Sequence, residues 1–247
     1  MNNKILMILP LLISSPNCLI EVEEPTNVTS DFAQLANFSI GTDYSFLSSK
    51  KSCVKFYSEN SFVATANVYA AWYKTSNNNL RIFTYVQMEP RRQSFSCILG
   101  KCFKQGYSKE VRVTSTLDSK LDIMSPEPVS QQDFTTYELG GSVSETGLAF
   151  ESSVSVTKGQ LQIIGNHSIS DKKYDADYIY KGSKDTTYRK TYSEQKGTFA
   201  ILMNGISYFE SSVSFTIDFG MYASSSLFTK DLPVPITLKL SYSGSLL

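Results

Sequence analysis

Histidine and tryptophan are the scarcest residues of this 247-residue chain, which holds one of each, His167 and Trp72. A single histidine cannot build a multi-histidine metal site, and it leaves only one candidate base for a nucleophilic triad. No glycine-rich stretch is followed by lysine and serine at the spacing of a phosphate-binding loop. The sequence therefore predicts no metal, no cofactor and no enzymatic activity, and we expect His167 to be an exposed loop residue.

An excess of charge of one sign is also missing, since 23 Lys and Arg residues balance 23 Asp and Glu residues. Such a balance gives no general affinity for nucleic acid. The charges are nevertheless unevenly placed: residues 37–116 hold eleven basic and four acidic side chains, whereas residues 117–247 hold eleven and fifteen. The basic half is either ordinary solvated surface or a surface that meets an anionic membrane or glycan.

Apolar runs long enough to cross a bilayer as a helix are absent too. The apolar run from Ile5 to Ile13, behind Lys4, is too short for a membrane helix and has the layout of a secretory signal. We therefore expect residues 1–18 to be a signal peptide and the protein to be secreted. Retention of Cys18 as a lipidated first residue is the alternative.

Cysteine is sparse, with four residues in the chain. Cys97 and Cys102 enclose a glycine in "CILGKC", and an oxidising compartment predicts a disulfide between them. Removal of Cys18 with the signal would leave Cys53 unpaired, either as a buried thiol or in an intermolecular bridge. Three tripeptides would be glycosylated in a eukaryotic source; they begin at Asn27, Asn37 and Asn166.

Residues that favour β-strands are abundant and alternate with Ser, Thr and Lys at period two. In residues 62–72 every second side chain is apolar, and residues 80–89 follow after an asparagine-rich turn, so a hairpin is predicted. Only residues 31–36 look helical. The expected fold class is all-β with very little helix, arranged as an elongated antiparallel β-sandwich or as two stacked β modules.

The amino-acid composition changes at one segment, which divides the chain into two parts. The segment "SPEPVSQQD" at residues 125–133 has the composition of a linker. Before it, residues 19–124 would form a β-rich body that contains the predicted disulfide. After it, residues 134–247 would form a second β module rich in Ser and Thr.

One octapeptide occurs twice in the second module, as "FESSVSVT" at residues 150–157 and "FESSVSFT" at residues 209–216. Each copy predicts a strand with one thin apolar face and one hydroxyl-rich face. Such alternation is typical of a half-solvated sandwich strand. It is also what a membrane-spanning barrel requires, because its strands face lipid on one side and a watery lumen on the other.

On these residues, the segment 135–170 resembles the insertion regions of secreted β-pore-forming toxins of the aerolysin-like and leukocidin-like families. The resemblance implies a soluble monomer that binds a cell-surface lipid, glycan or protein receptor and then forms a homo-oligomer. Residues 135–170 would be the insertion hairpin, contributed to a shared barrel in the target membrane. The candidate insertion side chains are Phe150, Val154, Val156, Phe209, Val213 and Phe215.

Under the same resemblance, the aromatic-rich first half would recognise the target. Aromatic rings beside guanidinium groups suit sugars and lipid headgroups. The candidates are Trp72, Tyr73, Arg81, Arg91 and Arg92. Most of the aromatic residues in this half are expected to lie in the core, and only one or two at a binding surface. The alternative function is a secreted adhesion or ligand- or glycan-binding β-sandwich without membrane insertion.

Overall fold

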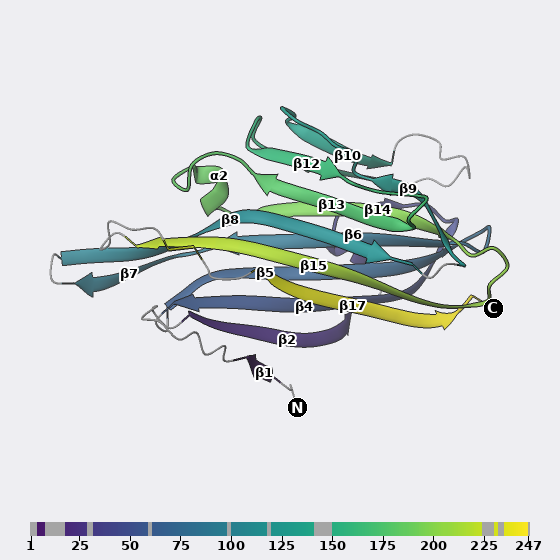
Figure 1. Cartoon of the computed structure of the whole chain (residues 1–247), viewed down its shortest axis with the longest axis horizontal. Helices are drawn as coiled ribbons and strands as arrows, with labels where there is room; N and C mark the ends of the chain where they lie inside the picture. The colour runs from purple at the N-terminus through teal and green to yellow at the C-terminus, as the bar shows by residue number, and fades with distance from the viewer. Residues whose placement is uncertain are drawn as a thin grey trace.

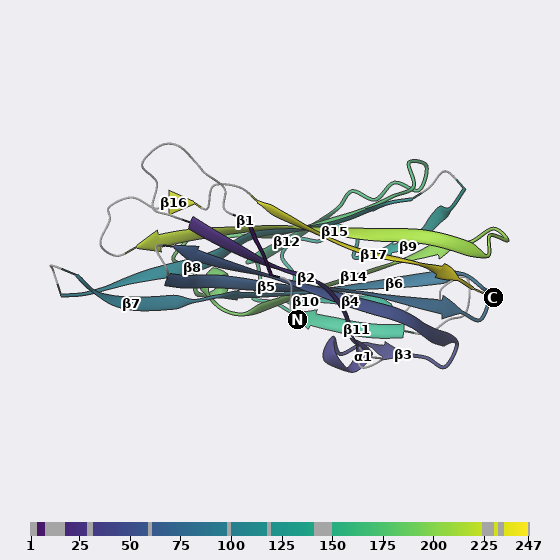
Figure 2. The ribbon, with the colours of Figure 1, turned by 90° about the horizontal axis from the view of Figure 1, so that it is seen from below.

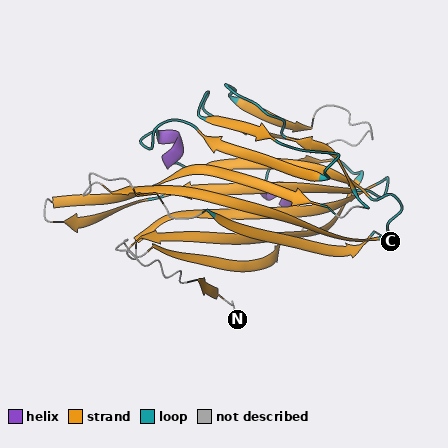
Figure 3. Cartoon of the chain, viewed as in Figure 1, coloured by secondary structure: helices purple, strands orange, loops and turns teal. Residues whose placement is uncertain are grey.

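The computed structural model describes residues 4–7, 18–28, 32–58, 61–97, 100–117, 120–140, 150–223, 230–231 and 235–246. Two short helices, α1 (Phe32–Leu35) and α2 (Thr187–Lys190), accompany a set of strands that dominates the chain (Figures 1 and 3). The strands are β1 (Lys4–Met7), β2 (Cys18–Val28), β3 (Ser39–Ile40), β4 (Tyr44–Ser58), β5 (Ser61–Thr75), β6 (Leu80–Pro90), β7 (Arg92–Cys97), β8 (Gly100–Thr116), β9 (Asp122–Glu127), β10 (Thr136–Gly140), β11 (Phe150–Ser155), β12 (Leu161–Gly165), β13 (Lys173–Tyr180), β14 (Ser193–Leu202), β15 (Tyr208–Ala223), β16 (Lys230–Asp231) and β17 (Ile236–Ser245).

The strands form three antiparallel sheets. The central sheet has the order β1-β2-β4-β5-β6-β14-β9. The facing sheet has the order β12-β13-β8-β15-β16, and β17 and β7 pair with β15 and β8. The small sheet has the order β10-β11-β3. The predicted all-β, elongated antiparallel architecture is confirmed.

The central sheet is the middle layer. Trp72 on one face donates a hydrogen bond from its indole nitrogen to Ser211 Oγ of the facing sheet, over 3.3 Å. On the other face, Phe83 lies 5.4 Å, centroid to centroid, from Phe150 of the small sheet. Because both faces are covered, almost every side chain of β6 is buried. Figure 2 shows β11, β3 and α1 together on the outer side of this layer.

Strands from before and after residues 125–133 share both large sheets. β14 pairs with β6 and β9 in the central sheet, while β8 lies between β13 and β15 in the facing sheet. β9 runs to Glu127, inside the expected linker, and Gln131 forms an isolated bridge with Ile163. The two halves of the chain therefore do not build separate sheets.

Local predictions from the first half are confirmed. β5 and β6 pair from Ala64 opposite Pro90 to Lys74 opposite Leu80, which is the predicted hairpin. The helical turn expected at residues 31–36 is α1.

At the N-terminus, β1 pairs with residues 20–23 of β2. Cleavage of a signal peptide at residues 1–18 would remove β1, and this cleavage stays a prediction. In the described part of the chain, no helix has both the length and the apolar character needed to cross a membrane.

Candidate functional site

The two copies of the octapeptide form strands with the predicted alternation. In β11 the side chains of Phe150, Ser152 and Val154 are buried, whereas the residues between them are exposed. In β15 the buried set is Phe209, Ser211, Val213 and Phe215. The copies differ in what surrounds them.

The second copy is built into the sandwich. Along one edge β15 pairs with β17 over residues 208–217, and along the other it pairs with β8 over residues 214–223. Val213 and Phe215 are fully buried, and Phe209 is nearly so. These three candidate insertion side chains stabilise the core, so they could reach lipid only if the sandwich opened.

The first copy lies in the small sheet. β11 pairs with β10 from Glu151 opposite Gly140 to Ser155 opposite Thr136. Its other edge meets β3 only at Phe150 opposite Ile40 and Glu151 opposite Ser39. We call residues 136–155, β10 and β11 with their connection, the outer hairpin; residues 141–149 lie outside the described part.

The outer hairpin is shorter than the predicted segment 135–170. β12 pairs with β13 in the facing sheet, so residues 161–165 belong to the sandwich. Val156, just beyond β11, is partly buried against the core.

Arg81 lies beneath the start of β11. Its guanidinium carbon is 4.3 Å from the centroid of the Phe150 ring, and its side chain is 4% exposed. Nε donates a hydrogen bond of 2.8 Å to Thr198 Oγ1, whereas one terminal nitrogen has no hydrogen-bond partner among the described residues. Burial lowers the pKa of Arg81, and the more distant Glu127 carboxylate opposes this effect.

Lys196 of β14 is the second buried cation under the outer hairpin, and its side chain is 2% exposed. Nζ donates to Ser152 Oγ over 2.8 Å and to the carbonyl oxygen of Ser153 over 3.3 Å. Burial lowers its pKa, with the charge of Glu194 opposing. Within the described residues, neither Lys196 nor Arg81 forms an ion pair. A charge buried without an opposite charge destabilises the folded state unless hydrogen bonds compensate.

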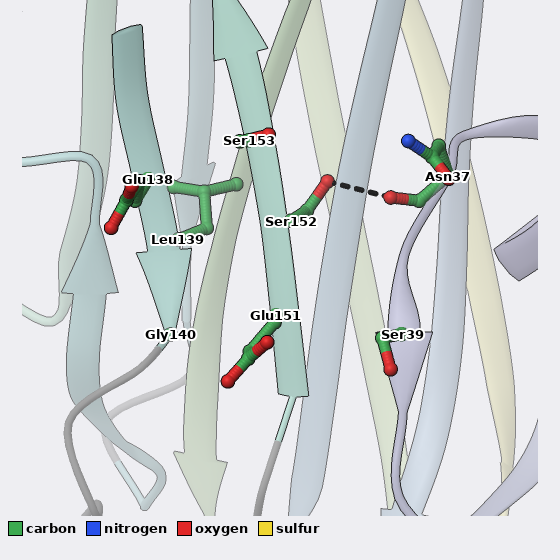
Figure 4. Close-up of a pocket in the computed structure, with 8 residues that line it drawn as sticks. All are labelled: Asn37, Ser39, Glu138, Leu139, Gly140, Glu151, Ser152 and Ser153. Carbon is green, nitrogen blue, oxygen red and sulfur yellow. Dashed lines mark hydrogen bonds between the residues drawn. The ribbon is translucent and has the colours of Figure 1, made fainter.

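Polar contacts fix the outer hairpin at its edges. Tyr137 Oη accepts a hydrogen bond of 2.7 Å from the backbone nitrogen of Lys196. The backbone nitrogen of Gly140 donates to Glu127 Oε2 over 2.8 Å. Ser152 Oγ donates to the carbonyl oxygen of Asn37 over 2.9 Å (Figure 4). Each of these bonds breaks if the hairpin leaves.

A polar groove of about 400 Å³ lies along the small sheet (Figure 4). Its lining residues come from β10, β11, β3 and the segment that leads into β3: Asn37, Ser39, Glu138, Leu139, Gly140, Glu151, Ser152 and Ser153. The two carboxylates and the hydroxyl groups make the groove acidic and hydrophilic.

The candidate receptor residues divide into two groups. Trp72, Tyr73 and Arg81 are buried, because both faces of the central sheet are covered, and they offer no binding surface in this structure. Arg91 and Arg92 are exposed. Their guanidinium carbons lie 4.9 Å and 3.8 Å from the ring centroids of Phe62 and Phe103.

The two arginines stand at the base of a projecting hairpin. β7 and β8 pair from Arg92 opposite Gln105 to Cys97 opposite Gly100, and together they extend beyond the rest of the molecule (Figures 1 and 2). Phe62, Phe95 and Phe103 are only half-buried there. The aromatic rings beside these two arginines are therefore not the predicted Trp72 and Tyr73, and the role of Arg91 and Arg92 in binding stays a prediction.

Cys53 is a buried free thiol, as expected for the odd cysteine, and its sulfur lies 3.4 Å from Thr65 Oγ1. The side chain of Cys97 lies outside the described part, so the Cys97–Cys102 disulfide stays a prediction.

His167 lies in the loop between β12 and β13, as expected, but it is half-buried, so the expectation that it is exposed is wrong. Its ring stacks on Tyr174 with 4.7 Å between centroids, Nε2 donates to the Pro128 carbonyl over 2.9 Å, and Nδ1 accepts from the Asp175 backbone nitrogen over 3.1 Å. Burial lowers its pKa, and the Pro128 carbonyl and Asp175 carboxylate oppose that effect. Sequence reasoning missed this role because Pro128 is distant along the chain. Among the described residues, no three metal-ligating side chains gather.

Comparison with known proteins finds no matching family model and no matching curated protein. Solved structures that match include Clostridium perfringens delta-toxin, with a TM-score of 0.48 and 8% identity over 85% of this chain and 96% of the toxin. A structure described as a pore-forming protein matches with a TM-score of 0.48 and 8% identity, over 95% of each chain. The NetB toxin of Clostridium perfringens, in its membrane-inserted form, matches with a TM-score of 0.47 and 9% identity, over 84% of this chain and 96% of the toxin.

These matches extend over most of the chain and include leukocidin-like β-pore-forming toxins, the second of the two groups that the segment 135–170 resembles. At such identities and TM-scores the similarity by itself assigns no activity to this chain.

Proposed function

We propose that this protein is a secreted, homo-oligomeric pore-forming protein whose outer hairpin leaves the central sheet and joins a membrane-spanning barrel. The observation that carries the proposal is the position of the outer hairpin, which covers two cations that lack an ion-pair partner among the described residues. Its backbone pairing outside the hairpin is limited to two residues of β3, and its other contacts with the rest of the chain are side-chain packing and the hydrogen bonds described above, so it can separate without breaking either large sheet.

Release of the outer hairpin has a cost and a gain. It exposes Phe150 and Val154 and breaks the bonds of Tyr137, Gly140 and Ser152 described above. It also returns Arg81 and Lys196 to water, and the burial cost for such ions is several kcal/mol each before hydrogen bonds offset it. In a bilayer the alternation of β11 then gives its exposed apolar face to lipid and its hydroxyl face to a lumen.

The projecting β7–β8 hairpin is our candidate for first contact with the target cell. Arg92 is available to pair with phosphate or other anionic groups, whereas Arg91 would exchange its present ion pair with Glu89, at 2.8 Å, for such a group. Phe62, Phe95 and Phe103 supply apolar surface beside them. This surface lies apart from the outer hairpin, so binding and insertion are separable in an experiment.

A reversible disulfide between β11 and β3 tests the proposal. Ser39 and Glu151 are Cα partners in an antiparallel pair, the arrangement in which Cα atoms come within disulfide range. We expect oxidised Ser39→Cys/Glu151→Cys to bind vesicles but release no dye, and a reducing agent to restore release. The matched control is Ser212→Cys/Ser241→Cys, which links β15 to β17.

The control lock joins two strands that stay paired in the proposed mechanism, so its oxidised form should release dye as the wild type does. Dye release by the oxidised Ser39→Cys/Glu151→Cys protein would refute the insertion of this hairpin. Binding without release by every form, the wild type included, would favour the alternative function, a secreted adhesion or glycan-binding sandwich.

A further inference from the structure

The outward face of the outer hairpin carries negative charge. Glu138 and Glu151 are exposed, and the pairing of Glu138 with Ser153 and of Gly140 with Glu151 places both carboxylates on the same face. Figure 4 shows the two side chains on neighbouring strands. Neither forms an ion pair with the described residues.

No positive charge balances these carboxylates within the hairpin. The sequence from Phe134 to Thr157 contains Glu138, Glu145 and Glu151 but no Lys, Arg or His. The opposite face of the described strands, buried against the central sheet, carries Tyr137, Leu139, Phe150, Ser152 and Val154.

Strand geometry keeps these two faces apart in any β-structure, because successive side chains point to opposite sides. In a barrel that crosses a bilayer, one face must meet hydrocarbon and the other the lumen. The face with Tyr137, Leu139, Phe150 and Val154 suits lipid. The face with Glu138 and Glu151 must then line the lumen, since a carboxylate against lipid would oppose insertion.

We infer that the pore selects cations over anions, and that Glu138 and Glu151 are the residues that determine this selectivity. The inference rests on the proposed pore formation. Every subunit contributes both residues, so an oligomer arranges them as rings of carboxylates, which favour cations in a channel. Small inorganic cations such as K⁺ are the transported class.

Planar lipid bilayers with a KCl gradient test the inference, since the reversal potential gives the ratio of K⁺ to Cl⁻ permeability. We expect a ratio above 1 for the wild type and a fall toward 1 for Glu138→Gln/Glu151→Gln. The preference should also weaken as KCl rises from 0.1 to 1 M, because the Debye length falls from about 10 Å to about 3 Å.

The repeated octapeptide supplies a matched control. Glu210 follows Phe209 in the second copy as Glu151 follows Phe150 in the first, and it is exposed on β15 of the sandwich. Glu210→Gln removes the same charge in the same local sequence and should leave the permeability ratio unchanged. If the double variant opens no channels, single Glu151→Gln should show a smaller shift in the same direction.

The possible outcomes test pore formation and cation selectivity separately. Absence of conductance from the wild type on any membrane would overturn pore formation, and the selectivity with it. Conductance with a preference for Cl⁻, or a ratio that Glu138→Gln/Glu151→Gln and Glu151→Gln leave unchanged, would overturn the selectivity while pore formation stands. An equal effect of Glu210→Gln would also refute it, because the control charge lies outside the proposed lumen.

Discussion

A single substitution made in both copies of the octapeptide, Val154→Asp and Val213→Asp, distinguishes a detachable hairpin from a fixed strand. The two valines occupy the same place in nearly identical sequences, so local β-propensity is the same for both. Val213 is fully buried and pairs with Leu240 of β17, and β8 pairs with β15 from the next residue onward. Val154 is 6% exposed, in the outer layer.

For Val213→Asp we expect a large loss of stability. Burial of a valine side chain contributes about 1.5–3 kcal/mol. A carboxyl group left without a partner in the same place costs roughly 1–3 kcal/mol more, even when it is protonated. For a chain of this size each kcal/mol lowers the melting temperature by roughly 2–4 °C. A total of about 4 kcal/mol therefore predicts a decrease of roughly 8–16 °C.

For Val154→Asp we expect a much smaller effect on folding. The outer hairpin can lift and hydrate the new carboxylate while both large sheets stay paired. The melting temperature should therefore fall by only a few degrees, which corresponds to about 1–2 kcal/mol. Dye release from vesicles should nevertheless be lost, because the charge would face lipid in every subunit of the ring.

Circular dichroism melts and vesicle leakage, measured on both variants, distinguish a detachable hairpin from a strand fixed in the fold. Equal decreases in melting temperature would show that the outer hairpin is as integral to the fold as β15. Normal leakage by Val154→Asp would show that Val154 does not face lipid. Either result refutes the reasoning, and the first would favour a binding sandwich over a pore.

Two further predictions concern the cysteines and the histidine. Peptide mass mapping of the unreduced, secreted protein should find Cys97 linked to Cys102, and two free thiols or a link from either to Cys53 would contradict this. His167 has a pKa below its ordinary 6.5 in the folded chain, because burial disfavours the charged ring. The unfolded chain therefore binds more protons in the window between these two pKa values, and the free energy of unfolding falls as the pH drops through it, by at most about 1.4 kcal/mol per pH unit from this group. Denaturant titrations of His167→Gln should show a flatter dependence there, and an unchanged slope would contradict the assignment.

Alternation in the sequence predicted the strands but not the layers. The rule that every second side chain faces a core holds for β11 and β15, each with one covered face. It fails for β6, where Arg81 lies between Leu80 and Ile82 and all three are buried. Arg81 points away from the sandwich core, as its polarity suggests, but the small sheet covers that face as well.

The half-buried histidine and the buried lysine were missed for a related reason. His167 is held by the carbonyl of Pro128, and Lys196 by Ser152, which is 44 residues away in the chain. Pairings over such separations are set by sheet order and register, which periodicity does not encode. The hairpin of β5 and β6 was predictable because its partners adjoin one short turn.

The two copies of the octapeptide cannot be distinguished by their sequence pattern. Both have the residues of a strand that could face lipid, so the pattern alone makes both of them candidates for insertion. Their surroundings differ: β17 pairs with all of the second copy and β8 with its residues 214–216, in the facing sheet of the sandwich, whereas the first copy pairs with β10 at residues 151–155 and with β3 at residues 150–151, in the small sheet. Beneath β11, moreover, lie Arg81 and Lys196, whose burial without ion-pair partners among the described residues lowers the cost of release. If the proposed insertion of β11 is correct, the capacity to insert depends on the position of a strand in the fold as well as on its sequence, and a strand that covers a buried charge is the first candidate in other chains of similar composition.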